Sequence, residues 1–205
     1  MKKNNGKSIR IFKNSILESF THVHPIVPLI LWVPVICFLF YRGYAIKNLG
    51  AKEFAVLFVF GILLWTITEY LLHRYVFHWN AKSRAGKYFV FLFHGLHHDD
   101  PQDPTRLVMP PVPAILIVSI LWGIFEAIFP AAYIEVIMAN FLIGYLCYDY
   151  IHYATHHFAM TSRLGKYLRK YHLQHHYSGE QSKYGVSSPL WDYVFKTVSG
   201  PKEIH

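Results

Sequence analysis

The chain has 205 residues, of which 53% are hydrophobic and only 16% are charged. This composition is too apolar for an ordinary soluble domain, and the length suits one compact unit, so we expect a single domain over residues 1–205. The net charge of +8 is carried by basic residues scattered between long apolar stretches, which argues for segments beside a membrane and against a nucleic-acid-binding patch. Cys37 and Cys147 both lie inside apolar runs and predict no disulfide.

Four apolar stretches follow one another along the chain, and each is a candidate membrane-spanning helix. They cover residues 26–46, 54–72, 112–129 and 131–148. About 20 apolar residues in a helix cross a hydrocarbon layer of ~30 Å. The first two stretches meet that length, whereas the last two are slightly short and are separated only by Pro130. The second pair is therefore predicted to form a short hairpin that reaches part of the way across.

Lysine and arginine are distributed unevenly between the segments that join these stretches. Seventeen of the 20 basic residues fall before the first stretch, between the second and third, or after the fourth. Because basic residues are retained on the cytosolic side of a membrane, residues 1–25, 73–111 and 149–205 are predicted to be cytosolic. We expect an all-α integral membrane protein with about four transmembrane helices within residues 26–148 and a cytosolic helical cap.

Histidine is the unusual residue of this sequence, with 14 copies. Eleven lie in four clusters: His73 and His78 in HRYVFH; His94, His97 and His98 in HGLHH; His152, His156 and His157 in HYATHH; and His172, His175 and His176 in HLQHH. Each cluster falls in the segments assigned to the cytosol. The other three, His22, His24 and His205, are isolated and are interpreted as ordinary hydrogen-bonded or exposed residues.

The spacing within the clusters suits metal coordination. Residues three or four apart share a helix face, so His152 and His156 can hold one ion. In each HxxHH segment the first and last histidines share a face, and the middle one is turned toward a neighbouring ion. His73 and His78 are five apart, so either they bind different ions or the helix ends between them. His157 breaks the spacing and is interpreted as a packing residue, which leaves ten histidines, a number that suits two ions.

Two carboxylates lie about one helical turn before clustered histidines. Asp149 precedes His152 by three residues, and Glu69 precedes His73 by four. Either carboxylate could accept a hydrogen bond from the second ring nitrogen of a histidine ligand and fix its orientation. The alternative interpretation for each is an ordinary charge at the membrane interface.

A ligand set made of imidazole suits iron, copper, zinc and nickel. Oxygen activation needs a redox metal, which zinc is not. We therefore expect two iron ions with O2 as co-substrate, and zinc in the same sites of some purified preparations, because imidazole binds zinc more tightly than ferrous iron. A membrane metal transporter is the alternative of another class. It should place histidines or carboxylates inside its spans, and the apolar stretches contain none of the clustered histidines.

The order HxxxxH, HxxHH, HxxxH, HxxHH resembles the fatty acid hydroxylase and sterol desaturase superfamily of membrane di-metal enzymes. The segments RYVFH, FHGLHHDDPQDPTRLVMPPVP, YDYIHYATHH and YHLQHHYSGEQSKYGVSSPLWD look like the fatty acid 2-hydroxylases in particular. The resemblance covers most of the chain from Glu69 to Val194. The histidine pattern points to the superfamily, and RLVMPPVP and GVSSPLWD point to the 2-hydroxylase branch.

Carried onto this sequence, the resemblance implies a set of site residues. Its metal ligands fall on the ten histidines that spacing selects, namely His73, His78, His94, His97, His98, His152, His156, His172, His175 and His176. Tyr148 and Asp149 match positions expected near the bound acyl chain and are the candidate catalytic residues. We also expect Tyr145 and Arg106 to contact the substrate head group, with a basic membrane anchor as the alternative for Arg106.

The implied reaction inserts oxygen at carbon 2 of a long-chain fatty acyl group, as the free acid or within a ceramide or other sphingolipid. Sterol C4 oxidation, sterol desaturation and carotenoid ring hydroxylation are the alternatives within the superfamily. Many eukaryotic members begin with a cytochrome b5 domain, whereas about 25 residues precede the first apolar stretch here. We therefore expect a separate electron donor of the cytochrome b5 or ferredoxin type. The bacterial inner membrane is the favoured location, and the endoplasmic reticulum is the alternative.

Overall fold

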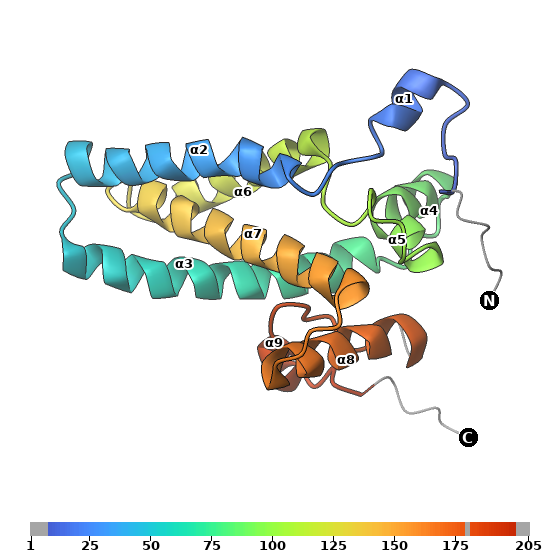
Figure 1. Cartoon of the computed structure of the whole chain (residues 1–205). Helices are drawn as coiled ribbons and strands as arrows, with labels where there is room; N and C mark the ends of the chain where they lie inside the picture. The colour runs from blue at the N-terminus through green and yellow to red at the C-terminus, as the bar shows by residue number, and fades with distance from the viewer. Residues whose placement is uncertain (1–7, 179–180, 200–205) are drawn as a thin grey trace.

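A computed structural model describes residues 8–178 and 181–199, and all regular structure within these ranges is helical (Figure 1). Four helical segments are long and apolar enough to cross a membrane: Val27–Ile46, Ala51–Phe77, Pro111–Ile128 and Ile134–His157. They lie side by side as an elongated bundle, and the shorter helices gather at one end of it. The predicted all-α membrane architecture is confirmed.

The helices follow the four apolar stretches and the histidine clusters. The short helix α1 spans Ser15–Ser19, and α2 spans Val27–Tyr41 before a π-helical turn, η1, at Arg42–Ile46. The second span consists of α3 (Ala51–Leu71) and a second π-helical turn, η2 (Leu72–Phe77). The remaining elements are α4 (Arg84–Val90), η3 (Phe91–Gly95), α5 (Leu96–Asp99), α6 (Pro111–Ile128), α7 (Ile134–His157), α8 (Arg163–Ser178) and α9 (Leu190–Val194).

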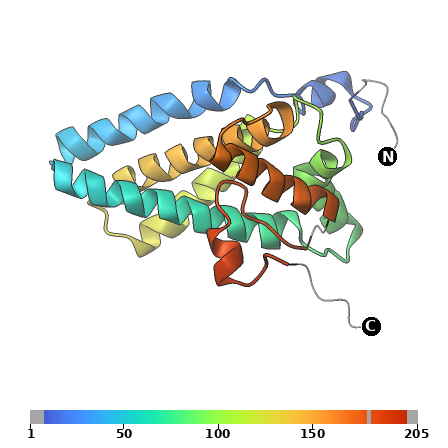
Figure 2. The ribbon, with the colours of Figure 1, turned by 60° about the horizontal axis from the view of Figure 1, so that its bottom comes forward.

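Two segments far apart in the sequence form a helical cap at one end of the bundle. The loop between the second and third spans contributes α4, η3 and α5, and the C-terminal segment contributes α8 and α9 (Figures 1 and 2). In Figure 2, α8 and α9 lie across the adjacent ends of α3 and α7, and the contacts of α8 with α7 and of α9 with α3 agree with this view. The cap therefore rests directly on the two helices that carry polar residues out of the membrane.

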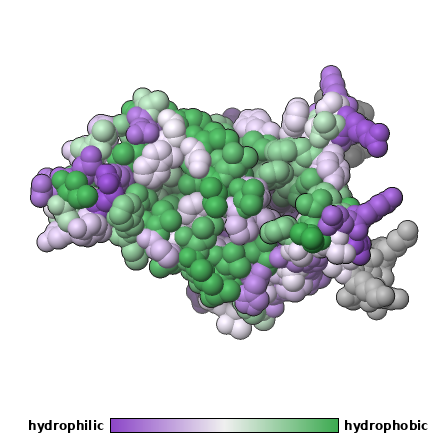
Figure 3. Space-filling model, turned by 90° about the horizontal axis from the view of Figure 1, so that it is seen from above, coloured by the Kyte–Doolittle hydropathy of each residue, from purple (hydrophilic) through white to green (hydrophobic). Residues whose placement is uncertain are grey.

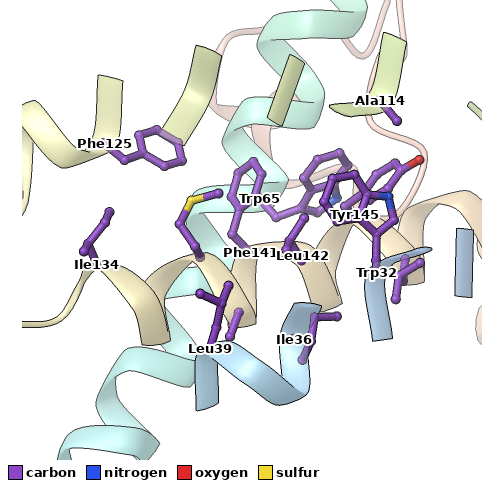
Figure 4. Packing of buried hydrophobic residues seen from close by; sticks show 13 residues of the cluster. Trp32, Ile36, Leu39, Trp65, Ala114, Phe125, Ile134, Phe141, Leu142 and Tyr145 are labelled. Atoms are coloured by element: carbon purple, nitrogen blue, oxygen red, sulfur yellow. The ribbon is translucent and has the colours of Figure 1, made fainter. Parts of the chain in front are cut away.

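The central helix of the bundle is α7, which packs against α2, α3 and α6. Over the most apolar 18 residues of α7, 72% of the residues are buried, whereas only 11% of those of α6 are buried. Aromatic side chains fill the interface between α3 and α7: the ring of Trp65 lies 5.1 Å from that of Phe141 and 5.3 Å from that of Tyr145, between centroids (Figure 4). The core therefore forms around α7, and α6 presents most of its surface outward.

The outer surface of the bundle is apolar where a bilayer would surround it. Val56 and Val59 of α3 and Val112 and Leu116 of α6 are all exposed. Figure 3 shows hydrophobic residues across the middle of one face and hydrophilic residues gathered at both ends. This banding is expected of helices that cross a hydrocarbon layer.

The last of the four helices extends beyond the apolar stretch that predicted it. Helix α7 begins at Ile134 and runs to His157, well beyond the predicted end at Tyr148, because the helix continues through polar residues that lower its hydropathy. Its last turns carry His152 and His156 into the cap, and residues 134–148 alone reach about 22 Å, so the short hairpin stays a prediction for this pair. At the opposite end from the cap, the buried Glu135 of α7 pairs with Arg42 of η1 at 2.7 Å.

We predict that Gly144→Val destabilises the bundle, because Gly144 of α7 packs directly against Trp65 of α3. A Cβ at this position would lie 2.6 Å from the Cβ of Trp65. Overpacking of this kind costs about 1–3 kcal/mol, which should lower the melting temperature in detergent by about 2–12 °C. The matched control is Gly123→Val in α6, where a Cβ meets nothing within 4 Å. Equal melting temperatures for the two variants would contradict this account of the interface.

Candidate metal centre

The ten histidines selected by their spacing lie together at the cap end of the bundle, in two groups of five. The first histidine group contains His73, His78, His94, His98 and His175, and the second contains His97, His152, His156, His172 and His176. Within each group the ring nitrogens that could serve as ligands all lie within 4.8 Å of one another. Four separate segments of the chain, in η2, in η3 with α5, in α7 and in α8, thus converge on two points.

Each HxxHH segment contributes to both groups, as its spacing predicts. His94 and His98 lie in the first group, whereas His97 between them is turned toward the second. The segment in α8 divides in the opposite sense, since only its middle histidine joins the first group. The rings of His98 and His176 stack with their centroids 4.2 Å apart, so the two groups lie directly beside each other.

His73 and His78 belong to the same group, and of the two alternatives for this pair the second holds, since the helix ends between them at Phe77. The reason is the π-helical turn η2, in which the backbone N–H of His78 donates to the carbonyl of His73 at 3.1 Å. A turn closed by residues five apart brings both side chains to the same side of the helix. The α-helical spacing rule does not apply to this segment, and the turn ends at Phe77, directly before His78.

The Nε2 atoms of the first group face one another, which an ion would explain. The Nε2 of His73 lies 3.0 Å from that of His94 and 3.2 Å from that of His78. The Nδ1 of His73 donates to the backbone carbonyl of Tyr184 at 2.5 Å, so in the neutral ring its Nε2 carries a lone pair and no proton. The Nδ1 of His175 donates in the same way to the carbonyl of Ser182 at 2.7 Å. Such converging lone pairs fit a cation at the shared centre.

The distances between facing nitrogens also fit metal coordination. A metal–imidazole bond is about 2.0–2.1 Å long, so two ligands at a right angle lie ~2.9 Å apart. In the first group the Nε2 atoms of His94 and His98 are 2.9 Å apart. In the second, the Nε2 of His97 is 2.9 Å from that of His152 and 3.0 Å from that of His176. The five imidazole nitrogens of each group would hold one ion.

The cap histidines are held in the neutral form that metal binding requires. Burial lowers the pKa of His78 to about 3, of His98 to about 2 and of His175 to about 4, from an ordinary value of 6.5. The same desolvation, followed by repulsion from neighbouring imidazoles, lowers the pKa of His94 and His97 well below the ordinary value. Neutral imidazoles at neutral pH need lose no proton before they bind a metal.

A cavity of about 390 Å³ opens beside both histidine groups. His94 of the first group and His97 and His152 of the second line one part of it. The remaining walls are mostly apolar and come from the N-terminal segment, η3, the RLVMPPVP segment and the start of α6. A smaller cavity of about 40 Å³ between α3, α6 and α7 shares Phe77, Met109 and Tyr148 with it. The larger cavity therefore extends toward the hydrocarbon layer.

Three of the predicted substrate contacts lie on neighbouring turns of α7. Asp149 is 2% exposed, lines the larger cavity and makes no ion pair with the described residues. Tyr148 lines both cavities and stacks on His152 with centroids 5.7 Å apart. Tyr145 is buried and lines the smaller cavity. A buried carboxyl without a basic partner beside a metal-binding cluster is a candidate functional group.

Arg106, the fourth predicted contact, also lines the larger cavity but is already paired. Its guanidinium Nη2 lies 2.6 Å from Glu18 Oε1, and its Nη1 donates to the carbonyl of Ile9. The side chain is only 4% exposed. Arg106 thus holds the N-terminal segment against the cavity, where Phe12 and Phe20 form part of the wall.

The carboxylate expected to orient His73 has other partners. Glu69 Oε1 accepts the backbone N–H groups of Val186, at 2.6 Å, and Ser187, at 2.9 Å. The groups that hold His73 and His175 are backbone carbonyls, which no residue-type pattern marks. Ser182 and Tyr184, which supply these carbonyls, lie in the YHLQHHYSGEQSKYGVSSPLWD segment, directly before its GVSSPLWD part.

The histidines excluded from the ligand set lie outside both groups. The ring of His157 contacts that of Tyr153 at a tilt, with centroids 4.6 Å apart. His22 Nδ1 is 2.6 Å from Thr105 Oγ1 in the N-terminal contact. His24 accepts the backbone N–H of Ile26 at 3.2 Å. The expectation for His205 lies outside the described residues.

The chain is similar to one known protein family and to several known proteins. Residues 58–197, more than half of the chain, match the family described as fatty acid hydroxylase. A dihydroceramide fatty acyl 2-hydroxylase of Arabidopsis thaliana is 38% identical over 94% of this chain and 81% of its own length. The human fatty acid 2-hydroxylase is 35% identical over 96% of this chain and 58% of its own length.

A yeast protein provides the structural comparison. The ceramide very long chain fatty acid hydroxylase of Saccharomyces cerevisiae is 37% identical over 96% of this chain, which spans about half (51%) of that relative. A solved structure of full-length scs7p, in which only the hydroxylase domain is visible, superposes with a TM-score of 0.85 at 36% identity. That match covers 94% of this chain and 72% of the solved one.

We predict that His156→Ala removes one metal ion and leaves the other. His156 belongs to the second group only, so the first group keeps its five ligands. Metal analysis of the purified protein after dialysis should give about two ions per chain for the wild type and about one for the variant. His22→Ala, which lies outside both groups, should retain about two. Full metal content in His156→Ala would remove it from the ligand set.

In the metal-free protein, we predict that acidification destabilises the fold from about pH 6.5 downward. The pKa values of His78 and His175 are about 3 and about 4 in the folded chain, against 6.5 ordinarily. At a pH between the folded and the ordinary pKa values, the unfolded chain binds more protons than the folded chain. The free energy of unfolding therefore falls as the pH falls, and the contribution of these histidines is fully present above pH 6.5. Melting temperatures of chelator-treated protein between about pH 7.5 and pH 5 measure this effect. A constant or rising melting temperature on acidification would contradict it.

Proposed function

The chain belongs to the fatty acid hydroxylase family, and from that premise we propose that it is a membrane di-iron monooxygenase acting at carbon 2 of a long-chain fatty acyl group. Membership confirms the resemblance read from the sequence and makes the protein a hydroxylating oxidoreductase. The observation that carries the proposal is the apolar cavity of about 390 Å³ with both histidine groups in its wall.

The reaction requires two metal ions, O2 and a supply of electrons. Iron bound by the two histidine groups would supply the redox chemistry that activates O2; zinc in the same sites would leave the protein inactive. In the overall reaction one oxygen atom enters the C–H bond at carbon 2 and the other leaves as water. Two electrons and two protons from an external donor balance it.

The protein's own contribution is to position the acyl group beside the two histidine groups. The apolar walls favour a long tail, since each buried methylene contributes roughly 0.8 kcal/mol. Asp149 shares a proton with a carboxylic acid head or accepts the N–H of an amide head, and Tyr148, fixed by its stacking on His152, forms the adjacent wall. Carbon 2 is the first methylene after the head, so a head held at Asp149 presents that carbon to the metals. Arg106 shapes the site by closing the N-terminal segment over it.

The names of the relatives support an acyl chain in a sphingolipid as the substrate. The plant relative is a dihydroceramide fatty acyl 2-hydroxylase, and the yeast relative is a ceramide very long chain fatty acid hydroxylase. The mammalian relatives are fatty acid 2-hydroxylases. We extend these two substrate forms, the ceramide-bound chain and the free acid, to this protein.

The proposal places the histidine cap on the cytosolic side of the membrane. The bias of lysine and arginine toward the segments that form the cap supports this side. A cytosolic carrier of the cytochrome b5 or ferredoxin type would supply the electrons, and the net charge of +8 would attract an acidic one. The relatives named above come from a plant, a yeast and mammals, so they do not favour a bacterial membrane.

Cells that express the chain and receive labelled palmitate should accumulate labelled 2-hydroxypalmitate, free or within ceramide, as detected by mass spectrometry. His156→Ala should abolish the product, and Asp149→Ala should lower turnover at least tenfold, since the head group loses its hydrogen-bonding partner. If the metal-loaded wild type yields no 2-hydroxy acyl product in any lipid fraction, the proposal fails. An oxidised sterol or a hydroxylated carotenoid would instead support another reaction of the superfamily.

A further inference from the structure

Residues 182–187, which we call the clamp loop, are held through five consecutive backbone N–H groups. The N–H of Lys183 donates to the carbonyl of Thr197 at 2.8 Å. Those of Tyr184 and Gly185 donate to the two carboxylate oxygens of Asp192, at 2.9 and 2.8 Å. Those of Val186 and Ser187 donate to Glu69 of α3, at 2.6 and 2.9 Å. Two carboxylates thus hold four of the five N–H groups of the loop.

The opposite side of the clamp loop faces the first histidine group. The carbonyl of Ser182 accepts the Nδ1 proton of His175, and that of Tyr184 accepts the Nδ1 proton of His73. In the described ranges no such bond reaches the second group, whose five Nδ1 atoms are buried without a hydrogen-bonding side chain or backbone partner. The loop therefore orients ligands of one group and not of the other.

Both carboxylates are too buried to serve as surface charges. Asp192 is 0% exposed and Glu69 is 4% exposed. Asp192 also accepts the hydroxyl of Thr197 at 2.7 Å, and Glu69 accepts the hydroxyl of Ser187. Every one of these contacts either holds the clamp loop or braces its neighbour, so the loop is the structure that the two carboxylates maintain.

We propose that Glu69 and Asp192 are positioning residues that, through the clamp loop, fix His73 and His175 and so make the first metal site the more tightly held of the two. This inference rests on the proposed di-metal centre and deepens it. Loss of an oriented hydrogen bond to a ligand's second nitrogen typically weakens metal binding 10–100-fold. Breaking the clamp should therefore free the metal of the first group and leave that of the second in place.

Gly185 shows how closely the clamp is built. A Cβ there would lie 2.0 Å from the carbonyl oxygen of Ser188 and 3.0 Å from Asp192 Oδ2. No side chain fits without moving backbone. Gly185→Ala therefore displaces the clamp loop while both carboxylates remain, which separates the position of the loop from the charge that holds it.

The test measures release of Zn²⁺ from the full chain in detergent, challenged with EDTA and analysed for metal per chain over time. Asp192→Ala, Glu69→Ala and Gly185→Ala should release one of the two ions about tenfold faster than the wild type or more. Glu69→Gln should behave like the wild type, since its amide oxygen can still accept both N–H groups. The matched control is Glu135→Ala, which removes a buried carboxylate at the opposite end of the bundle.

Double variants assign the ion that is lost. In the Asp192→Ala background, His78→Ala should change nothing further, because the first group is already weakened. His156→Ala in that background should leave about no metal. If both ions leave Asp192→Ala at the same accelerated rate, or neither does, the clamp has no selective role and the inference is overturned. Should Asp192→Ala and Glu69→Ala fail to fold, the metal release of Gly185→Ala compared with that of Glu69→Gln decides the question. A wild type that never holds two ions instead refutes the di-metal centre itself.

Discussion

Seven buried and three half-buried histidine rings turn their Nε2 atoms toward two common points, and the rest of the structure serves this arrangement. In His73 and His175 a backbone carbonyl accepts the Nδ1 proton, so the Nε2 of the neutral ring faces its neighbours with a lone pair. Bound cations would make this arrangement favourable. The ligands therefore have to be delivered by rigid elements, and their unused nitrogens have to be satisfied by groups of fixed position.

The bundle supplies the rigid elements by running two of its helices past the apolar layer. Helix α7 continues to His157, and α3 continues through η2, so the histidines of both lie where the cap covers them. Two of the π-helical turns, η2 and η3, contain His73 and His94. Such turns are frequent at functional sites because they redirect side chains without ending the helix. The same placement leaves an apolar cavity between the metals and the bilayer, which a lipid tail can enter.

The sequence predicted those parts of the site that depend on local periodicity. The division of each HxxHH segment between two groups follows from the three- and four-residue spacing, and so does the pairing of His152 with His156. For His73 and His78 the sequence left two alternatives open, because the period of a π-helical turn differs from that of an α-helix. The partners of Glu69 and Arg106 could not be predicted, for a different reason. They lie 117 and 88 residues away in the sequence, and those of Glu69 include backbone groups. Contacts of that kind depend on the tertiary fold and leave no pattern of residue types.

The most direct test of this account is anomalous diffraction from crystals of the metal-loaded protein, recorded on either side of the iron or zinc absorption edge. Two anomalous peaks are predicted, one inside the ring of His73, His78, His94, His98 and His175 and one inside that of His97, His152, His156, His172 and His176. Each ion should be bound by five imidazole nitrogens. A single peak, no peak, or ions bound away from these rings would contradict the central claim.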